Sequence, residues 1–381
     1  MIYYCIIVLL LTLYYMGLQT YYLKGWQSLP LWNIPKNYQP KTFISILIPA
    51  RNEADNITHC IDSILNQRYP SSLFEILVID DHSTDDTATL VKNYNLSNVH
   101  CLALADYVDR AKIQSFKKKA IEIALTQAKG ELIVGTDADC ITQKDWLALL
   151  ASFYEQKDLK FIAAPVNFYQ EQTTFERFQS LDFMGMMGIT GSGIHTQLMH
   201  MCNGANMAYT KSAFDAVGGF EGTEQFASGD DMMLLHKIAK RYPNQIGFLK
   251  NQSATVFTKA KSTLKGFINQ RVRWSTKSGS YEEKQVTLLL ALVWFFCLSI
   301  PLTFLLAFWG GIYFVYLGLF QLACKAIVDY PLLSQTSKFF NRKEMMQVFG
   351  IASIYHLLYI IVVGFLGGVV KNYEWKGRRV R

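Results

Sequence analysis

The sequence predicts an α/β domain built on a mostly parallel sheet and flanked by membrane-spanning helices. Two observations predict it. Between residues 42 and 285, short apolar runs of strand length alternate with stretches of helical periodicity, and the segments on either side are apolar over more than about 20 residues, the length that crosses a bilayer. A hydrophobic content of 51% in 381 residues fits one globular domain with a few spans.

The alternating elements justify the sheet. The apolar runs are 43–48, 74–79, 99–104, 131–136 and 161–166, and the clearest helical stretches between them are 54–65, 86–94 and 117–128. Nearly continuous apolar strands separated by helices are typical of a parallel sheet covered on both faces. Ligands bind such sheets at the carboxyl ends of the strands, which is where the polar motifs of this chain occur.

The membrane segments follow from length and charge. Residues 1–23 carry no charged side chain and lack the basic start and small-residue cleavage site of a signal peptide, so they predict a retained anchor. Residues 24–41, with three prolines, predict a linker. Residues 286–371 hold three apolar stretches at 286–308, 312–332 and 347–370.

Topology is less direct. The loop with Lys338, Arg342 and Lys343 and the basic tail, 372–381, both favour the cytoplasmic side. An anchor and three complete spans would place the tail outside, so one segment is expected not to cross fully. We expect this segment to be 312–332, which carries Lys325 and Asp329.

Composition excludes several classes of protein. The net charge of +7 suits anionic lipid or a phosphorylated substrate, but no basic stripe interleaved with aromatic residues indicates nucleic-acid binding. The seven cysteines are scattered and form no CxxC pair, which argues against a disulfide framework or a zinc site and fits a reducing cytoplasm.

Three acidic clusters are candidates for chemistry, and each has a simpler structural interpretation. Asp80 and Asp81 end the second apolar run, where Ser83 or Thr84 could cap a helix that has Asp85 and Asp86 in its first turn. The Asp-x-Asp pair at 137 and 139 could hold a hard divalent cation with its phosphates, or simply solvate a turn. The pair at 230 and 231, after Ser228, could supply a general base or complement a helix dipole.

A fourth motif precedes the second apolar region. Gln270, Arg273 and Trp274 follow one another at helical spacing. A basic helix end near anionic headgroups would explain the arginine but would not require the glutamine and the tryptophan.

The order of these motifs resembles the membrane-integrated family 2 glycosyltransferases, the branch with cellulose, hyaluronan and poly-N-acetylglucosamine synthases and ceramide glucosyltransferase. The segments that carry the resemblance are 44–53, 78–85, 128–139, 203–209, 217–220, 229–231 and 270–274. It implies a Rossmann-like GT-A nucleotide-sugar domain at 42–285, with a mixed, mostly parallel sheet. It also implies Mg²⁺ or Mn²⁺ as the cofactor.

The resemblance also implies residue roles, residue by residue. Glu53, Asp80, Asp81 and Lys117 would contact the nucleotide-sugar, Asp137 and Asp139 would hold the metal and diphosphate, and Asp231 would be the base that activates the acceptor. Asp230, Gln270, Arg273 and Trp274 would border the diphosphate and the acceptor. Departures from the family pattern are Asp230 in place of Glu, Phe116 where Gly is usual, and Lys259 and Lys261 in the loop on the acceptor side.

The implied activity is inverting transfer of a sugar, expected to be UDP-linked, to a lipid or glycan acceptor at the membrane, giving a β-glycoside. The expected location is a bacterial inner membrane, with the catalytic domain in the cytoplasm. A processive polysaccharide synthase that works with a partner membrane subunit, and a non-catalytic nucleotide-sugar-binding membrane protein, are the alternatives. A dinucleotide dehydrogenase is disfavoured because no G-x-G-x-x-G follows the first strand.

Overall fold

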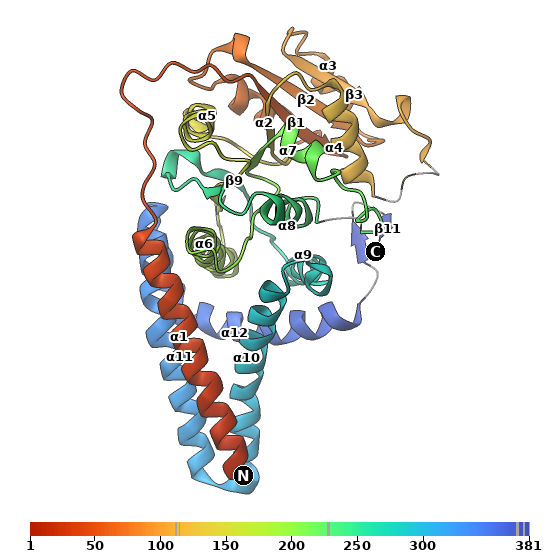
Figure 1. Ribbon diagram of the computed structural model, residues 1–381. Helices are drawn as coiled ribbons and strands as arrows, with labels where there is room; N and C mark the ends of the chain where they lie inside the picture. Colours follow the sequence, from red (N-terminus) through yellow and green to blue (C-terminus); the bar gives the residue numbers. More distant parts are fainter. Residues whose placement is uncertain (111–112, 114, 227–228, 371–372, 376–377, 381) are drawn as a thin grey trace. The chain divides into compact units, whose positions relative to one another are not determined.

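The computed structural model describes residues 1–381 except 111–112, 114, 227–228, 371–372, 376–377 and 381. The chain divides into two compact units (Figure 1). The helical unit comprises Met1–Leu29, Gln170–Met199 and Ala260–Lys371, and the sheet unit comprises Pro30–Tyr169, His200–Lys259 and Asn372–Arg381. Each unit is described by itself.

The sheet unit is built on seven strands in the order β3-β2-β1-β4-β7-β5-β8. All neighbours are parallel except β7, which is antiparallel to both β4 and β5. The mixed, mostly parallel sheet expected from the sequence is confirmed. The strands are β1 (Ile44–Ala50), β2 (Phe74–Asp80), β3 (Val99–Ala103), β4 (Leu132–Gly135), β5 (Phe161–Ala163), β7 (Met207–Thr210) and β8 (Ile246–Phe248).

The expected strand at 161–166 is wrong in one respect, because the structure splits it. β5 ends at Ala163, and β6 (Val166–Tyr169) begins a separate two-stranded sheet with β9 (Val256–Lys259). Pro165 lies at the break, and proline has no N–H to donate to a ladder. A third small sheet pairs β10 (Tyr373–Trp375) with β11 (Arg378–Val380) in the tail.

The helices of the sheet unit lie close to the expected positions. They are α2 (Ile57–Leu65), α3 (Thr87–Lys92), α4 (Phe116–Gln127), α5 (Trp146–Lys157), α7 (Lys211–Ala216) and α8 (Met232–Arg241), with 3₁₀ turns η1 (Ser71–Leu73), η2 (Leu104–Asp106) and η4 (Gln252–Ala254). β1 and β2 are buried along almost their whole length, as two-sided coverage of a parallel sheet requires.

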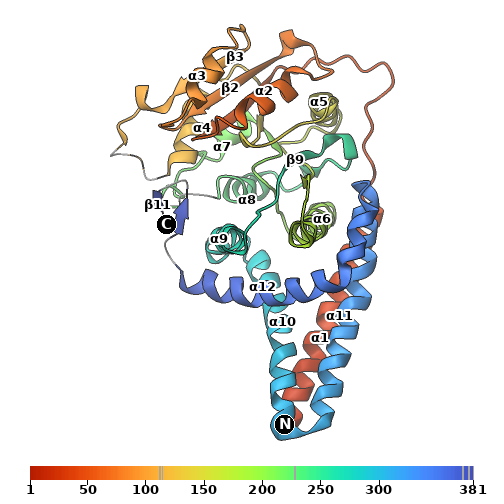
Figure 2. The same cartoon turned by 180° about the vertical axis from the view of Figure 1, so that it is seen from behind.

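The helical unit holds α1 (Ile2–Ser28), α6 (Thr174–His195), α9 (Leu264–Ser275), α10 (Lys284–Gly310), α11 (Ile312–Phe339) and α12 (Phe349–Val369), with η5 (Ser278–Ser280) and η6 (Lys343–Val348). α1, α10 and α11 run side by side as one bundle (Figures 1 and 2). Tyr15 of α1 stacks on Phe296 of α10 at 4.1 Å between ring centroids. Four helices of the described chain are long and apolar enough to cross a membrane, by length and composition.

α12 differs from the other three in direction. Both views show it lying across the bundle, and it packs on α6, α9 and α10 (Figures 1 and 2). α11, in contrast, runs along α1 and α10. Its charges Lys325 and Asp329, which led us to expect an incomplete span, pair with each other one turn apart, and Tyr15 donates to Asp329 at 2.7 Å. Paired charges inside a bundle are compatible with a spanning helix.

α6 begins with a capping box, because Thr173 accepts from the Glu176 N–H while Glu176 accepts from the Thr173 N–H. Its pattern at 172–195 could equally predict an amphipathic interfacial helix or a buried one. The structure buries most of α6 against α1, α11 and α12, so it is a buried helix. The expected domain at 42–285 stays a prediction, since α6 and α9 group with the long helices.

Candidate functional site

The candidate site of the sheet unit begins where three parallel strands end together. In the register of β1 and β2, Ala50 lies opposite Asp80, and in that of β1 and β4, Leu47 lies opposite Gly135. Two backbone bonds extend these pairings past the strands: Asp81 N–H donates to Ala50 at 2.8 Å and Thr136 N–H to Leu47 at 3.2 Å. The first two acidic clusters therefore leave the same edge of the sheet.

Hydrogen bonds hold the loops after β1 and β2 together. Arg51 Nη1 donates to the backbone carbonyls of Asp81 and His82, both at 2.7 Å. Glu53 N–H donates to Thr87 Oγ1 at 2.8 Å, and its carboxylate accepts from Asn56. The resemblance implies a nucleotide-contacting role for Glu53 and none for Arg51. The available signal was that Arg51 stands directly after an apolar strand that ends beside an acidic pair.

The helix-cap interpretation of the first cluster is not what the structure contains. α3 begins at Thr87 with Asp86 at the N-cap and no side-chain cap bond, so neither Ser83 nor Thr84 caps it. Asp80 is buried, and its Oδ1 has no hydrogen-bond partner among the described residues. A buried acceptor without a donor is costly in a folded protein, and it suits a ligand that brings an N–H or O–H.

Asp81 lies against His82. The His82 ring nitrogen Nδ1 is 3.0 Å from Asp81 Oδ1, and its ring meets Phe116 edge-on at 6.1 Å. His82 has a φ of 54°, which non-glycine residues adopt rarely. This geometry places the imidazole against Phe116, the first residue of α4.

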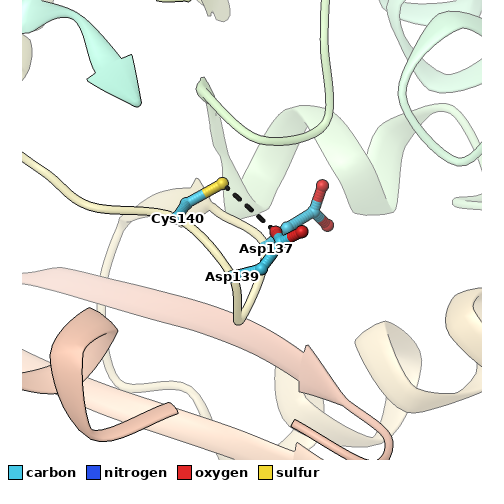
Figure 3. A group of neighbouring side chains, drawn as sticks. All are labelled: Asp137, Asp139 and Cys140. Atoms are coloured by element: carbon cyan, nitrogen blue, oxygen red, sulfur yellow. Dashed lines mark hydrogen bonds between the residues drawn. The ribbon is translucent and has the colours of Figure 1, made fainter. Parts of the chain in front are cut away.

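The second cluster has the donor set of a hard-cation site. Oxygens of Asp137 and Asp139 and the sulfur of Cys140 all lie within 4.8 Å of one another, and Figure 3 shows that one loop carries the three side chains. Cys140 donates to Asp139 Oδ1 at 3.6 Å, and burial raises the pKa of its thiol well above the ordinary value. Carboxylate oxygens suit Mg²⁺ and Mn²⁺, whereas sulfur suits softer ions, so the two aspartates fit the expected metal.

Lys117 connects the second cluster to the third. Its ammonium lies 2.9 Å from Asp137 Oδ1 and 3.2 Å from Asp230 Oδ2. Burial opposes the charge on Lys117, but the carboxylates of Asp137, Asp230 and Asp231 together raise its pKa above the ordinary value. Lys117 is therefore an ammonium ion that holds residues from two distant stretches of chain at one place.

Asp231 is held by two backbone donors. Its Oδ1 accepts from Met232 N–H at 2.7 Å, which caps α8, and its Oδ2 accepts from Gly204 N–H at 3.0 Å. The helix-start interpretation of this cluster is therefore correct for Asp231, but it is incomplete. A Cβ built on Gly204 would lie 3.4 Å from Lys117 Nζ and 3.6 Å from the Asp231 Cβ, so this glycine lies directly between them. Ser228 lies outside the described residues.

Asn206 anchors the loop that carries Gly204. It is fully buried, donates to the carbonyls of Pro165 and Ala254 at 2.7 and 2.8 Å, and accepts from Trp146 Nε1 at 2.9 Å. Sequence analysis included Asn206 in a motif without giving it a role. A polar residue between apolar neighbours at the start of β7 was the available signal.

The fourth motif lies on α9 of the helical unit. Gln270, Arg273 and Trp274 are partly buried, and Gln270 Oε1 is a buried acceptor with no hydrogen-bond partner among the described residues. The structure thus brings Lys117, Asp137, Asp139, Asp230 and Asp231 together in the sheet unit, and it places Gln270, Arg273 and Trp274 together in the helical unit.

A GT-A-like mixed sheet with an Asp-x-Asp pair at its edge defines a nucleotide-sugar-dependent transferase. Comparison with family models agrees. Residues 45–218 match the glycosyl transferase family 2 model, and residues 132–365 match that of glycosyl transferase family group 2. The second match covers more than half of the chain, including α10, α11 and most of α12. The chain belongs to the family 2 glycosyltransferases, and its four candidate spans are compatible with integration in a membrane.

Two curated relatives illustrate the range of the family. Glycosyltransferase AglE of Haloferax volcanii is 27% identical over 146 residues, which is 38% of this chain and 46% of AglE. Poly-beta-1,6-N-acetyl-D-glucosamine synthase of Staphylococcus epidermidis is 23% identical over 247 residues, 64% of this chain and 56% of the synthase. The chain therefore spans about half the length of these relatives.

A solved structure shares the fold. The mannosyltransferase PcManGT of Pyrobaculum calidifontis, in complex with GDP-Man and Mn²⁺, superposes with a TM-score of 0.57 at 19% identity, over 95% of this chain and 99% of PcManGT. At this identity the likeness shows the fold alone. It confirms the GT-A architecture, and the ligands belong to PcManGT.

Proposed function

We propose that this chain transfers a sugar from a nucleoside-diphosphate sugar, UDP-linked in the first instance, to a lipid or glycan acceptor at the membrane, forming a β-glycosidic bond. The observation that carries the proposal is the bridge made by Lys117. It connects Asp137, from the pair suited to a metal, with Asp230, the neighbour of the proposed base. In the proposed reaction, the diphosphate of the donor and the hydroxyl of the acceptor must both lie next to this bridge.

The donor would bind at the edge of the sheet. The Oδ1 of Asp80, which has no hydrogen-bond partner among the described residues, would accept an N–H of the base or a ribose hydroxyl. Glu53 lies in the loop that is hydrogen-bonded to the segment after β2. Asp137 and Asp139 would hold Mg²⁺ or Mn²⁺, which when bound supplies a positive charge for the diphosphate leaving group. Lys117 would add a second positive charge, supplied by the protein itself.

Asp231 would be the general base. Its carboxylate accepts two backbone N–H bonds, which fix its orientation. A carboxylate that removes the acceptor proton while the hydroxyl attacks contributes roughly 10²–10⁴-fold. Attack from the face opposite the diphosphate inverts the anomeric carbon, so an α-linked donor would give a β-linked product.

The helical unit supports an acceptor at the membrane. α1, α10 and α11 expose large apolar side chains along their lengths, among them Leu10, Leu13, Phe295, Leu305, Phe320 and Ile327. Four candidate spans are few for a polysaccharide channel formed by one chain, which favours a lipid acceptor. The likeness to a poly-N-acetylglucosamine synthase supports the alternative, a processive synthase that acts with a partner membrane subunit.

We further propose that α12 lies in the plane of the membrane. It crosses the bundle, and its outer face is a stripe of exposed apolar residues at helical spacing: Ile351, Ile354, Leu358, Val362, Phe365 and Val369. Its inner face packs on α6 and α9. If only α1, α10 and α11 cross the membrane, the Lys338–Lys343 loop and the basic tail lie on the same, cytoplasmic side. In a bacterium this membrane would be the inner membrane. The tail strands β10 and β11 also belong to the sheet unit.

A donor screen tests this function. The purified chain in vesicles that contain diacylglycerol or decaprenyl phosphate is incubated with UDP-, GDP- and dTDP-sugars and Mn²⁺, and nucleoside diphosphate release and labelled lipid are measured. One donor should give both signals, with a β-anomeric proton in the product. Release from none of the donors, or an α-linked product, would overturn the proposal. A polymeric product would favour the synthase alternative.

A further inference from the structure

A buried ion pair lies inside the fourth motif. Arg271 stands between Gln270 and Arg273 on α9, and its guanidinium Nη2 is 3.0 Å from Asp182 Oδ2 on α6. The Arg271 and Asp182 side chains are 3% and 5% exposed. Neither residue is among those that the resemblance singles out.

Aromatic rings enclose the guanidinium. Its carbon lies 4.6 Å from the ring centroid of Trp274, 5.1 Å from Phe267, 5.6 Å from Tyr359 and 5.9 Å from Phe183. Trp274 is the nearest of the four, at a distance typical of a cation–π contact. Since Trp274 belongs to the motif expected to border the acceptor, the buried arginine touches that motif directly.

α6 contacts this part of α9 at two adjacent positions. Asp182 pairs with Arg271, and the next residue, Phe183, packs on Trp274 with 6.0 Å between ring centroids. α12 completes the arrangement, because Tyr359 Oη lies 3.0 Å from both oxygens of Asp182. The Asp182 carboxylate therefore accepts a hydrogen bond from α12 and pairs with the guanidinium on α9.

Stability alone does not explain this pair. Taking two charges out of water costs more than their attraction regularly returns, and apolar side chains of similar size serve a core equally well. Such a pair does specify one arrangement of the helices that carry it. Here the arrangement that it specifies includes the orientation of the Trp274 indole.

We propose that Asp182 is a positioning residue for acceptor use. It fixes the Arg271 guanidinium against the face of Trp274, and this contact orients the indole for the acceptor. The inference rests on the proposed function, in which Trp274 borders the acceptor. Asp182 is buried against Arg271 and Tyr359, so donor binding should be independent of it.

The test compares Asp182→Asn, Arg271→Gln, Arg271→Lys and the double variant Asp182→Asn/Arg271→Gln with wild type in vesicles that carry decaprenyl phosphate or diacylglycerol. Neither member of this pair is left as an unpaired buried charge in the double variant, so the double variant should fold even if a single variant fails to fold. Glu171→Gln is the matched control: Glu171 pairs with Arg342 at 2.7 Å next to α6 and makes no contact with Trp274 in the described structure.

Two measurements separate positioning from folding. The first is the split between acceptor KM and donor KM. Removal of the pair should raise acceptor KM about thirtyfold, the factor that a desolvated cation–π contact is worth, and leave donor KM within about twofold. The second is acrylamide quenching of Trp274, taken as the difference between each variant and the same variant carrying Trp274→Phe.

Asp182→Asn, Arg271→Gln and the double variant should share the raised acceptor KM and increased quenching of Trp274, and Arg271→Lys should recover part of both. Quenching and acceptor KM equal to those of wild type in the double variant would overturn the positioning role. A Trp274→Phe chain with normal acceptor KM would also overturn it, because the indole would then not serve the acceptor. No transfer to either lipid would overturn the proposed function instead. Quenching still decides the positioning role in that case.

Discussion

The Lys117 ammonium lies 3.2 Å from the Asp230 carboxylate, and this ion pair joins the start of α4 to the residue before the proposed base. The same ammonium reaches Asp137 at 2.9 Å. In the described structure, the ammonium of Lys117 therefore contacts both carboxylate clusters. A bound divalent cation and a diphosphate would lie at the same two clusters.

Replacement of Lys117 should move two affinities in opposite directions. Lys117→Met frees Asp137 from its cationic partner, so Mn²⁺ alone should bind more tightly. Nucleoside diphosphate should bind about ten- to hundredfold more weakly, because a hydrogen bond to a charged phosphate is lost. Titration calorimetry with Mn²⁺ and then with UDP or GDP checks both signs.

The control for this prediction is Lys119→Met, since Lys119 lies on the same helix and pairs only with Glu122 in the described structure. It should change neither affinity. If both affinities fall together in Lys117→Met, the lysine supports the local fold rather than the diphosphate.

Asp137 and Asp139 should be required for metal binding. Replacement of either by asparagine removes one anionic ligand, so the affinity for Mn²⁺ should fall by at least about tenfold, a loss that even outer-shell partners cause. Electron paramagnetic resonance of free Mn²⁺ measures it. Asp158→Asn is the control, because Asp158 is exposed and has a φ of 48°, a conformation that asparagine tolerates. Unchanged Mn²⁺ binding in both single variants would place the metal elsewhere.

Lys118 should give the fold a measurable dependence on pH. Burial lowers the pKa of Lys118 from 10.5 to about 8, while its ammonium donates to the Thr223 carbonyl at 2.6 Å. Between about pH 8 and 10.5, the unfolded chain binds the proton that the folded chain has released, so the free energy of unfolding rises with pH in that window.

Thermal unfolding of wild type and Lys118→Met at about pH 7.5 and 9.5 checks this sign, given the folded pKa of about 8. The midpoint of wild type relative to the variant should increase at the higher pH. A constant difference would mean that Lys118 has its ordinary pKa.

Membrane topology should follow the direction of α12. Green fluorescent protein fused after the tail should fluoresce, and alkaline phosphatase fused there should be inactive, because the proposed topology puts the tail in the cytoplasm. The same reporters inserted at Gly311, between α10 and α11, should give the opposite result. An active phosphatase at the tail would mean that α12 crosses the membrane.

The sequence predicted the sheet well because buried parallel strands are continuous apolar runs, and β1 and β2 are such runs. It did not predict the direction of β7, since a four-residue strand after a polar loop contains no signal for parallel or antiparallel pairing. It also missed the break at Pro165, because the apolar run continues through the proline.

The candidate site also has one part that could be predicted from the sequence and one part that could not. Asp80, Asp137 and Asp139 could be placed together from the sequence, since the carboxyl ends of parallel strands share one edge. The bridge from Lys117 to Asp230 and the pairing of Arg271 with Asp182 depend on how helices far apart in the chain pack. No local pattern predicts such contacts.

The most direct test of the proposed mechanism is turnover by Asp231→Asn, measured with donor binding on the same preparation. The variant should bind Mn²⁺ and nucleoside diphosphate like wild type and should transfer sugar at least about 100-fold more slowly, because the acceptor hydroxyl has no base. Asp215→Asn, an exposed change, should leave both quantities unaltered. Transfer at the wild-type rate by Asp231→Asn would contradict the account.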